Sequence, residues 1–227
     1  MEMNNQKRYR LDWNTVRHDW PLWVLMAGVL LASFVIYPYL PDQVPGHWNI
    51  HGQVDAYYPR SFGAFFPPLL AIAIYLLMLF TPVLNPRRDN YVRFKSAYTF
   101  LRWITIIFLV LIYAAAILAA LGYQINIGIV VKALVAVLFI MIGNYMGQFR
   151  HNYFVGIKTP WTLANEEVWQ RTHRIAGRIW VLGGFVCLAT APFQADWSAY
   201  VFFAALMLMT FVPVVYSYMI FNKLQNR

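Results

Sequence analysis

Metal-capable side chains gather in one short stretch of this sequence. They fall within fourteen residues: Asp42, His47, His51 and Asp55. A zinc site needs three or four such ligands converging at about 2.0–2.2 Å. A His-x3-His pair usually binds metal on a helix, and Gly46 and Gly52 argue against a helix here. We therefore predict that this stretch binds no metal. In the alternative, a metal site, the ligands would be His47, His51 and Asp55. We expect the stretch instead to contact a ligand through Asp42, Pro45, His47, Asn49, Gly52 and Asp55.

A second group of side chains could transfer protons. His173 with Glu166 or Glu167 has the composition of a general acid–base pair. A single histidine beside a tryptophan, here Trp169, is more often a packing or hydrogen-bonding residue. We therefore predict no enzymatic activity and no cofactor.

The elements that must position these groups are membrane helices. The 227 residues are 60% hydrophobic and 12% charged, with a mean hydropathy of +0.50, whereas roughly 25% of residues are charged in typical soluble domains. A soluble fold of this length could not bury so much apolar surface. The single Cys187 excludes a disulfide framework and a cysteine metal cluster.

Six apolar runs approach the ~20 residues that a spanning helix needs. They cover residues 21–40, 62–84, about 100–121, about 127–146, 179–195 and 200–221. Pro67, Pro68 and Pro213 lie inside runs and predict bent helices. No run contains Asp or Glu, and no internal repeat is visible, so the usual features of a coupled transporter are missing.

Basic residues orient the helices. Sixteen of the 18 Lys and Arg residues lie in the leader, the tail and alternate connections. Arg60 lies on the opposite face, and Lys132 lies one turn inside the fourth run, where its side chain can reach outward. By the positive-inside rule, both termini and residues 143–177 are cytoplasmic, and residues 41–61 are outside. This orientation accounts for the net charge of +9, and we predict no direct nucleic acid binding.

The predicted fold class follows from these patterns. It is an all-α integral membrane protein with six transmembrane helices, cytoplasmic N and C termini, and a short amphipathic interfacial helix between the fourth and fifth spans. The predicted divisions are a cytoplasmic leader (1–20), a two-helix hairpin (21–84) with an outer-loop motif (41–61), helices three and four (85–142), a region (143–221) with a cytoplasmic motif (143–177) and helices five and six, and a cytoplasmic tail (222–227).

The polar stretch 143–177 is more elaborate than a connection between two spans requires. Pro160 fixes its own φ, and Gly156 permits a backbone conformation that other residues resist. Thr162 or Asn165 can cap the helix that follows, which carries an apolar stripe and a basic side. We predict that this stretch binds a partner through Asn144, Asn152, Tyr153, Gly156, Lys158, Thr159, Pro160, Trp161, Glu167, Trp169 and His173.

The same stretch, GNYMGQFRHNYFVGIKTPWTLANEEVWQRTHRIAG, resembles the signature of the SdpI family of bacterial immunity proteins. Lys158 stands where the family commonly has Arg, which keeps the charge but loses the bidentate fork. The outer loop is similar to a second module often found in the same proteins. The residues that carry this second likeness are Leu40, Pro41, Asp42, Pro45, His47, Asn49, Gly52 and Asp55.

The resemblance implies a multi-pass protein of the bacterial cytoplasmic membrane that acts in immunity and signal transduction. It would give resistance to a secreted antimicrobial peptide toxin met on the outer face, and hold a transcriptional repressor at the membrane. Two alternatives stay open on the residues alone. One is a small transporter or exporter, and the other is a metal-dependent membrane enzyme.

Overall fold

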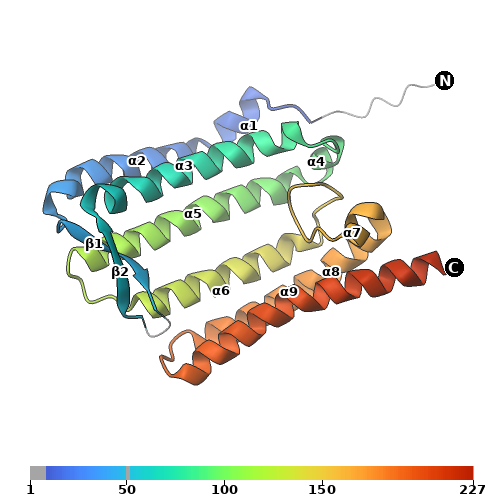
Figure 1. Ribbon diagram of the computed structural model, residues 1–227. Coiled ribbons are helices and arrows are strands. Elements are labelled where there is room, and N and C mark those ends of the chain that lie inside the picture. Colours follow the sequence, from blue (N-terminus) through green and yellow to red (C-terminus); the bar gives the residue numbers. More distant parts are fainter. Residues whose placement is uncertain (1–8, 50–51, 227) are drawn as a thin grey trace.

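The computed structural model describes residues 9–49 and 52–226. Its long helices lie side by side in a bundle (Figure 1): α2 (Trp20–Ile36), α3 (Arg60–Leu84), α5 (Lys95–Ala120), α6 (Ile127–Met146), α8 (Glu166–Thr190) and α9 (Asp196–Gln225). Shorter elements join them: α1 (Trp13–His18), the 3-10 turn η1 (Tyr37–Tyr39), β1 (Gln43–Trp48), β2 (Val54–Pro59), α4 (Asp89–Arg93) and α7 (Pro160–Ala164).

The two ends of the bundle are built differently. The β1–β2 hairpin lies at one end, named here the hairpin end (Figure 1). The first described residues, α4, α7 and the C-terminal end of α9 lie at the other, named the cap end (Figure 1). Both ends of the described chain therefore lie opposite the hairpin.

Within the described ranges, five helices are long and apolar enough to cross a membrane: Trp20–Tyr39, Arg60–Leu84, Lys95–Ala120, Ile127–Met146 and Asp196–Gln225. They correspond to the first four predicted runs and the sixth. The chain is thus a mostly helical, multi-pass membrane protein.

The predicted fifth run needs a correction. A short interfacial helix ending near Gly177 and a separate span over 179–195 were expected, but residues 166–190 form one continuous helix, α8. Asn165 caps it, because its side chain accepts hydrogen bonds from the backbone N–H groups of Glu167 and Val168. Gly177 does not end the helix, because tertiary packing overrides the weak helix propensity of glycine there.

Close backbone contact joins α6 to α8. A Cβ atom added at Gly177 would lie 2.7 Å from the carbonyl oxygen of Gly143. A larger residue at position 177 would therefore push the two helices apart. Small residues allow this kind of packing between membrane helices, where dispersion contacts replace the hydrophobic effect. Gly184 repeats the arrangement against Ala136 two turns further along. The α6–α8 pair is therefore fixed along most of the length of α6.

The loop between α2 and α3 is also more ordered than expected. Gly46 and Gly52 argued against a helix in this stretch, and the structure forms a hairpin: β1 and β2 pair antiparallel, with Val44 opposite Tyr58 and Trp48 opposite Val54. Pro45 lies within β1, where two register irregularities interrupt the ladder, as expected for proline in a short, twisted hairpin. Val44 is buried on the bundle and holds the hairpin to it.

A buried ion pair lies where α2 begins. The Asp19 carboxylate lies 2.6 Å from the Arg102 guanidinium and accepts hydrogen bonds from Trp103 Nε1 (2.8 Å) and the Tyr75 hydroxyl (3.0 Å). Both charged side chains are at most 1% exposed. The sequence pattern missed this acidic group because Asp19 lies just outside the first apolar run. Such burial is tolerated because the charge is paired and hydrogen-bonded.

Candidate functional site

The predicted partner-binding residues gather around one segment at the cap end. We name residues 147–173 the cap segment: a loop, then α7, then the first two turns of α8. Thr159 begins α7 with a capping box, because its hydroxyl accepts a hydrogen bond from the Thr162 N–H and the Thr162 hydroxyl accepts one from the Thr159 N–H. Pro160 occupies the first helical position, which suits its fixed φ.

His173 is the centre of the cap segment. Its side chain is fully buried, Nδ1 donates to the Trp169 carbonyl (2.8 Å), and Nε2 accepts from the Ile157 N–H (2.9 Å). The imidazole ring is therefore held in one neutral tautomer. Burial in apolar surroundings lowers the pKa of His173 to about 4. Because both ring nitrogens bind backbone groups, His173 does not form the acid–base pair with Glu166 or Glu167 that was considered above.

Trp169 and Gly156 complete this core. The Trp169 ring stacks on His173 with a centroid distance of 4.1 Å, and its Nε1 donates to the Phe149 carbonyl (2.8 Å). Gly156 has φ +112, and a Cβ atom there would lie 2.3 Å from His173 Nε2. Only glycine satisfies both conditions. The predicted turn residue thus lets the backbone close over the imidazole.

Asn152 organises the loop before α7. It is fully buried; its Oδ1 accepts from the N–H groups of Phe154 (2.8 Å) and Val155 (2.7 Å), and its Nδ2 donates to the Arg150 carbonyl (2.8 Å). Short polar side chains commonly form such local loops. Asn152 is therefore a structural residue of the loop.

The cap segment is also tied to other elements. Arg87, after α3, donates to His151 Nε2, and Asn90 in α4 donates to the His151 carbonyl (2.7 Å). Burial, and then the Arg87 charge, lower the pKa of His151. On the opposite side the Thr159 hydroxyl lies 3.0 Å from the hydroxyl of Ser217 in α9. The cap segment therefore joins the α3–α5 connection to α9.

The predicted partner-binding set divides into two groups. Asn152, Thr159, Trp169 and His173 are buried and serve the internal structure of the cap segment. Another group has side chains that are at least partly exposed: Tyr153, Lys158, Pro160 and Trp161. We name these residues, together with the neighbouring Phe154, the cap face. Glu167 is exposed and pairs with Arg171, and Asn144 lies apart on α6. Phe154, exposed at 43%, was not in the predicted set; its apolar character beside Tyr153 was the available signal.

The hairpin end carries the second predicted site. His47 Nδ1 lies 2.5 Å from Asp55 Oδ1 across the two strands, and Asp42 pairs with Arg60. The Asn49 side chain accepts from the Gln53 N–H (3.0 Å) and shapes the turn near Gly52. His51 lies outside the described residues. Among the residues that the structure describes, no three metal-capable side chains come together.

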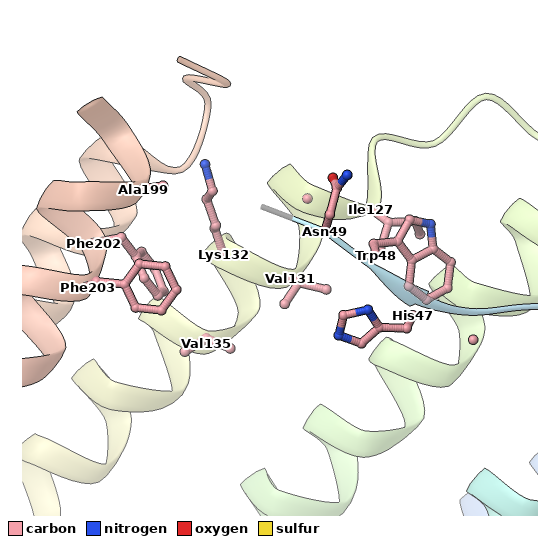
Figure 2. A pocket seen from close by; sticks show the side chains of 12 residues that line it. His47, Trp48, Asn49, Ile127, Val131, Lys132, Val135, Ala199, Phe202 and Phe203 are labelled. Atoms are coloured by element: carbon pink, nitrogen blue, oxygen red, sulfur yellow. The ribbon is translucent and has the colours of Figure 1, made fainter. Parts of the chain in front are cut away.

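A groove of about 360 Å³ opens beside the hairpin. Figure 2 shows His47 and Trp48 facing the N-terminal turns of α6, with Phe202 and Phe203 of α9 across the groove. The remaining walls are mainly apolar, from Val131, Val135, Ile127 and Ala199. Lys132 borders the groove and donates to the Phe193 carbonyl (3.0 Å) and the Ser198 hydroxyl (3.1 Å). The groove could therefore hold an apolar chain with polar contacts at one side.

These features define a helical multi-pass membrane protein with an ordered segment at each end. Residues 148–217 match the model of the SdpI/YfhL protein family, and residues 24–72 match a domain of unknown function (DUF1648). The chain is 25% identical over 203 residues to the immunity protein SdpI of Bacillus subtilis (strain 168), a match covering 89% of this chain and 95% of that protein. The predicted resemblance to the SdpI family is confirmed. No solved structure matches the chain.

Proposed function

We propose that this chain is an immunity protein of the bacterial cytoplasmic membrane, and that it gives resistance to a secreted antimicrobial peptide toxin. The observation that carries the proposal is the similarity to an immunity protein over 89% of the chain. The fold supports it, because ordered and accessible sites lie at opposite ends of one bundle (Figure 1).

The proposal includes six membrane crossings. Both ends of the described chain lie at the cap end (Figure 1), which requires an even number of crossings. The additional crossing is the C-terminal part of α8, since Gly177 lies against Gly143 and Gly184 against Ala136. This part of α8 therefore covers the same depth as α6, which is long and apolar enough to span. The charged first turns of α8 lower its average hydropathy, so that α8 is not among the five helices apolar enough to span.

The positive-inside rule then assigns the two ends. Basic residues concentrate in the segments at the cap end, whereas Arg60 lies beside the hairpin. The cap end is therefore cytoplasmic, and the hairpin end faces outside.

We assign the first contact with the toxin to the groove beside the hairpin. An apolar peptide that partitions into the outer leaflet would meet Val135, Phe202 and Phe203 from the lipid side, and His47 and Trp48 from the water side. Apolar walls with a few polar groups are typical of ligand sites. The cap face would hold the cytoplasmic partner, a transcriptional repressor, through Tyr153, Phe154, Lys158, Pro160 and Trp161.

A toxin-challenge assay tests immunity. Toxin-sensitive cells expressing the protein should survive, while cells carrying the empty vector should die. Val135→Trp, which fills the groove, should abolish protection, and Phe211→Trp, at a position 59% exposed on α9, should preserve it. Equal killing of wild-type and empty-vector cells, at matched membrane levels of protein, would reject the proposal for that toxin.

The partner role has its own assay. Trp161→Ala removes an accessible ring on the cap face that lies 5.0 Å from Tyr218, and should release a repressor from purified membranes without reducing survival under toxin. Trp197→Ala, at the hairpin end, is the control for loss of one tryptophan. Repressor retention unchanged by Trp161→Ala would remove the cap face from the proposal and leave immunity standing.

A further inference from the structure

A separate groove of about 480 Å³ lies at the cap end between α6 and α8. Its lining combines glycines with polar and apolar side chains: Gly143, Asn144, Gly147, Arg174, Gly177, Arg178, Val181 and Leu182. Arg174 and Arg178 lie one helical turn apart on the same side of α8, and both are exposed. No Asp or Glu is among the described residues that line it.

These two arginines differ from Arg171 on the same helix and from the buried Arg102. Arg171 pairs with Glu167, and Arg102 pairs with Asp19. Arg174 and Arg178 make no ion pair or hydrogen bond with any residue of 9–49 or 52–226. Two free guanidinium groups, together with the Asn144 amide, supply hydrogen-bond donors of the kind that bind a phosphate group.

The depth of the groove indicates what else the ligand contains. Further along α8, towards Thr190, the lining continues with Val181 and Leu182, and the Leu182 side chain is 67% exposed. Charge just before the apolar part of α8 and exposed apolar surface along that part match a phospholipid: phosphate beside the arginines and acyl chains along α8. A soluble phosphate would use only the first part.

We propose that this groove is a binding site for one anionic phospholipid of the cytoplasmic leaflet. Basic grooves between membrane helices on the cytoplasmic side are suited to anionic headgroups. Gly147 leaves room for the headgroup, because a Cβ atom there would have Arg174 Cα, at 3.9 Å, as its nearest described neighbour. The site uses the membrane orientation given above, but it does not depend on immunity or on any toxin.

Native mass spectrometry of the full-length protein tests the site, with phosphatidylglycerol and phosphatidylcholine of matched acyl chains as probes. Wild-type protein should retain one phosphatidylglycerol with an affinity about tenfold or more above that for phosphatidylcholine, since each basic residue contributes roughly fivefold. R174Q/R178Q should bring both lipids to equal retention. Gly147→Leu keeps both charges but fills the groove, and should also reduce retention. Arg171→Gln, on the same helix, should leave it unchanged.

Three results would overturn the proposal. They are equal retention of the two lipids by wild-type protein, unchanged preference in both R174Q/R178Q and Gly147→Leu, and full displacement of the lipid by an equal concentration of glycerol phosphate. The last result would assign the site to a soluble phosphate. Thermal unfolding midpoints of the variants show whether each remains folded, and because the two alterations are chemically unrelated, loss of fold in one leaves the other as the test.

Discussion

Histidine has opposite environments at the two ends of this molecule. At the cap end His173 is fully buried and both ring nitrogens bind backbone groups. At the hairpin end the His47 side chain is 66% exposed and pairs with Asp55, itself 42% exposed. A buried, fully hydrogen-bonded imidazole holds a structure in place, whereas an exposed one can contact a ligand. The cap end is therefore stabilised by buried polar groups, and the hairpin end leaves its polar groups accessible.

The largest expected effect is at the buried ion pair of the cap end. Arg102→Leu leaves the Asp19 carboxylate buried without its partner, so it should lower the free energy of unfolding by about 3–5 kcal/mol. Unfolding of purified protein in mixed detergent micelles, titrated with a denaturing detergent, measures this change.

Two variants sharpen this result. Arg93→Leu, at an exposed position in α4, should change stability by less than about 0.5 kcal/mol. Asp19→Asn combined with Arg102→Leu should recover part of the loss, because no uncompensated charge remains. Equal losses in Arg102→Leu and Arg93→Leu would contradict the view that buried polar groups stabilise the cap end.

Acid pH should weaken the cap end selectively. The pKa of His173 is about 4 in the folded protein, against 6.5 for free histidine, so the unfolded chain binds a proton that the folded chain excludes. Stability from this group is complete above pH 6.5 and is lost as the pH falls from about 6.5 towards about 4. The loss amounts to about 3 kcal/mol at most. Stability measured between pH 7.5 and 4 should show it.

His173→Gln should lose most of this pH dependence, and a smaller part should remain because burial also lowers the pKa of His151. A pH dependence kept in full by His173→Gln would contradict the role assigned to this buried imidazole.

Gly156→Ala should cost about 2 kcal/mol. The φ of +112 is strained for any residue with a Cβ atom, and that atom would overlap His173 Nε2. The loop 147–159 should then become more sensitive to limited proteolysis. Gly147→Ala is the matched control, since its φ of −66 suits alanine and its Cβ atom would have space. Equal sensitivity of the two variants would show that the loop does not depend on its closure over His173.

The smallest effect is expected at the hairpin end. Asp55→Asn removes an ion pair between two exposed side chains, so it should change stability by less than about 1 kcal/mol, and less again at high salt. Thermal unfolding should be measured at roughly 50 mM and roughly 500 mM salt, because exposed charges are screened weakly at the first concentration and strongly at the second. A loss above about 2 kcal/mol would mean that this pair contributes as much to the free energy of unfolding as the buried groups of the cap end.

The sequence alone predicts much of the bundle. Apolar length locates the helices that span, because lipid selects for about 20 apolar residues in each. It does not give the extent of α8: the fifth run, 179–195, covers only its apolar part, whereas the charged turns that begin with Glu166 and the apolar turns that end at Thr190 belong to one helix. Hydropathy separates those two parts, whereas the continuity depends on the contact of Gly177 with Gly143, which only the tertiary structure contains.

The candidate sites show the same limit. The motif residues of the cap segment can be recognised in the sequence, but not which of them face inward. Asn152 and His173 are buried, while Tyr153 and Lys158 are exposed, and residue type alone does not distinguish them. The hairpin was also missed, because its prolines and glycines are as typical of turns as of a twisted two-stranded ladder.

The continuity of α8 has a mechanical consequence. The helix contains no proline, unlike α3 and α9, and its 25 residues extend about 37 Å. No proline therefore interrupts the backbone hydrogen bonds of α8 between its two ends. A tilt of about 5° pivoting near Thr190 would displace the Glu166 end by roughly 3 Å, enough to reposition Trp169 and the loop that rests on it. If the proposed toxin contact at the hairpin end tilts α8, the loop at the cap end moves with it.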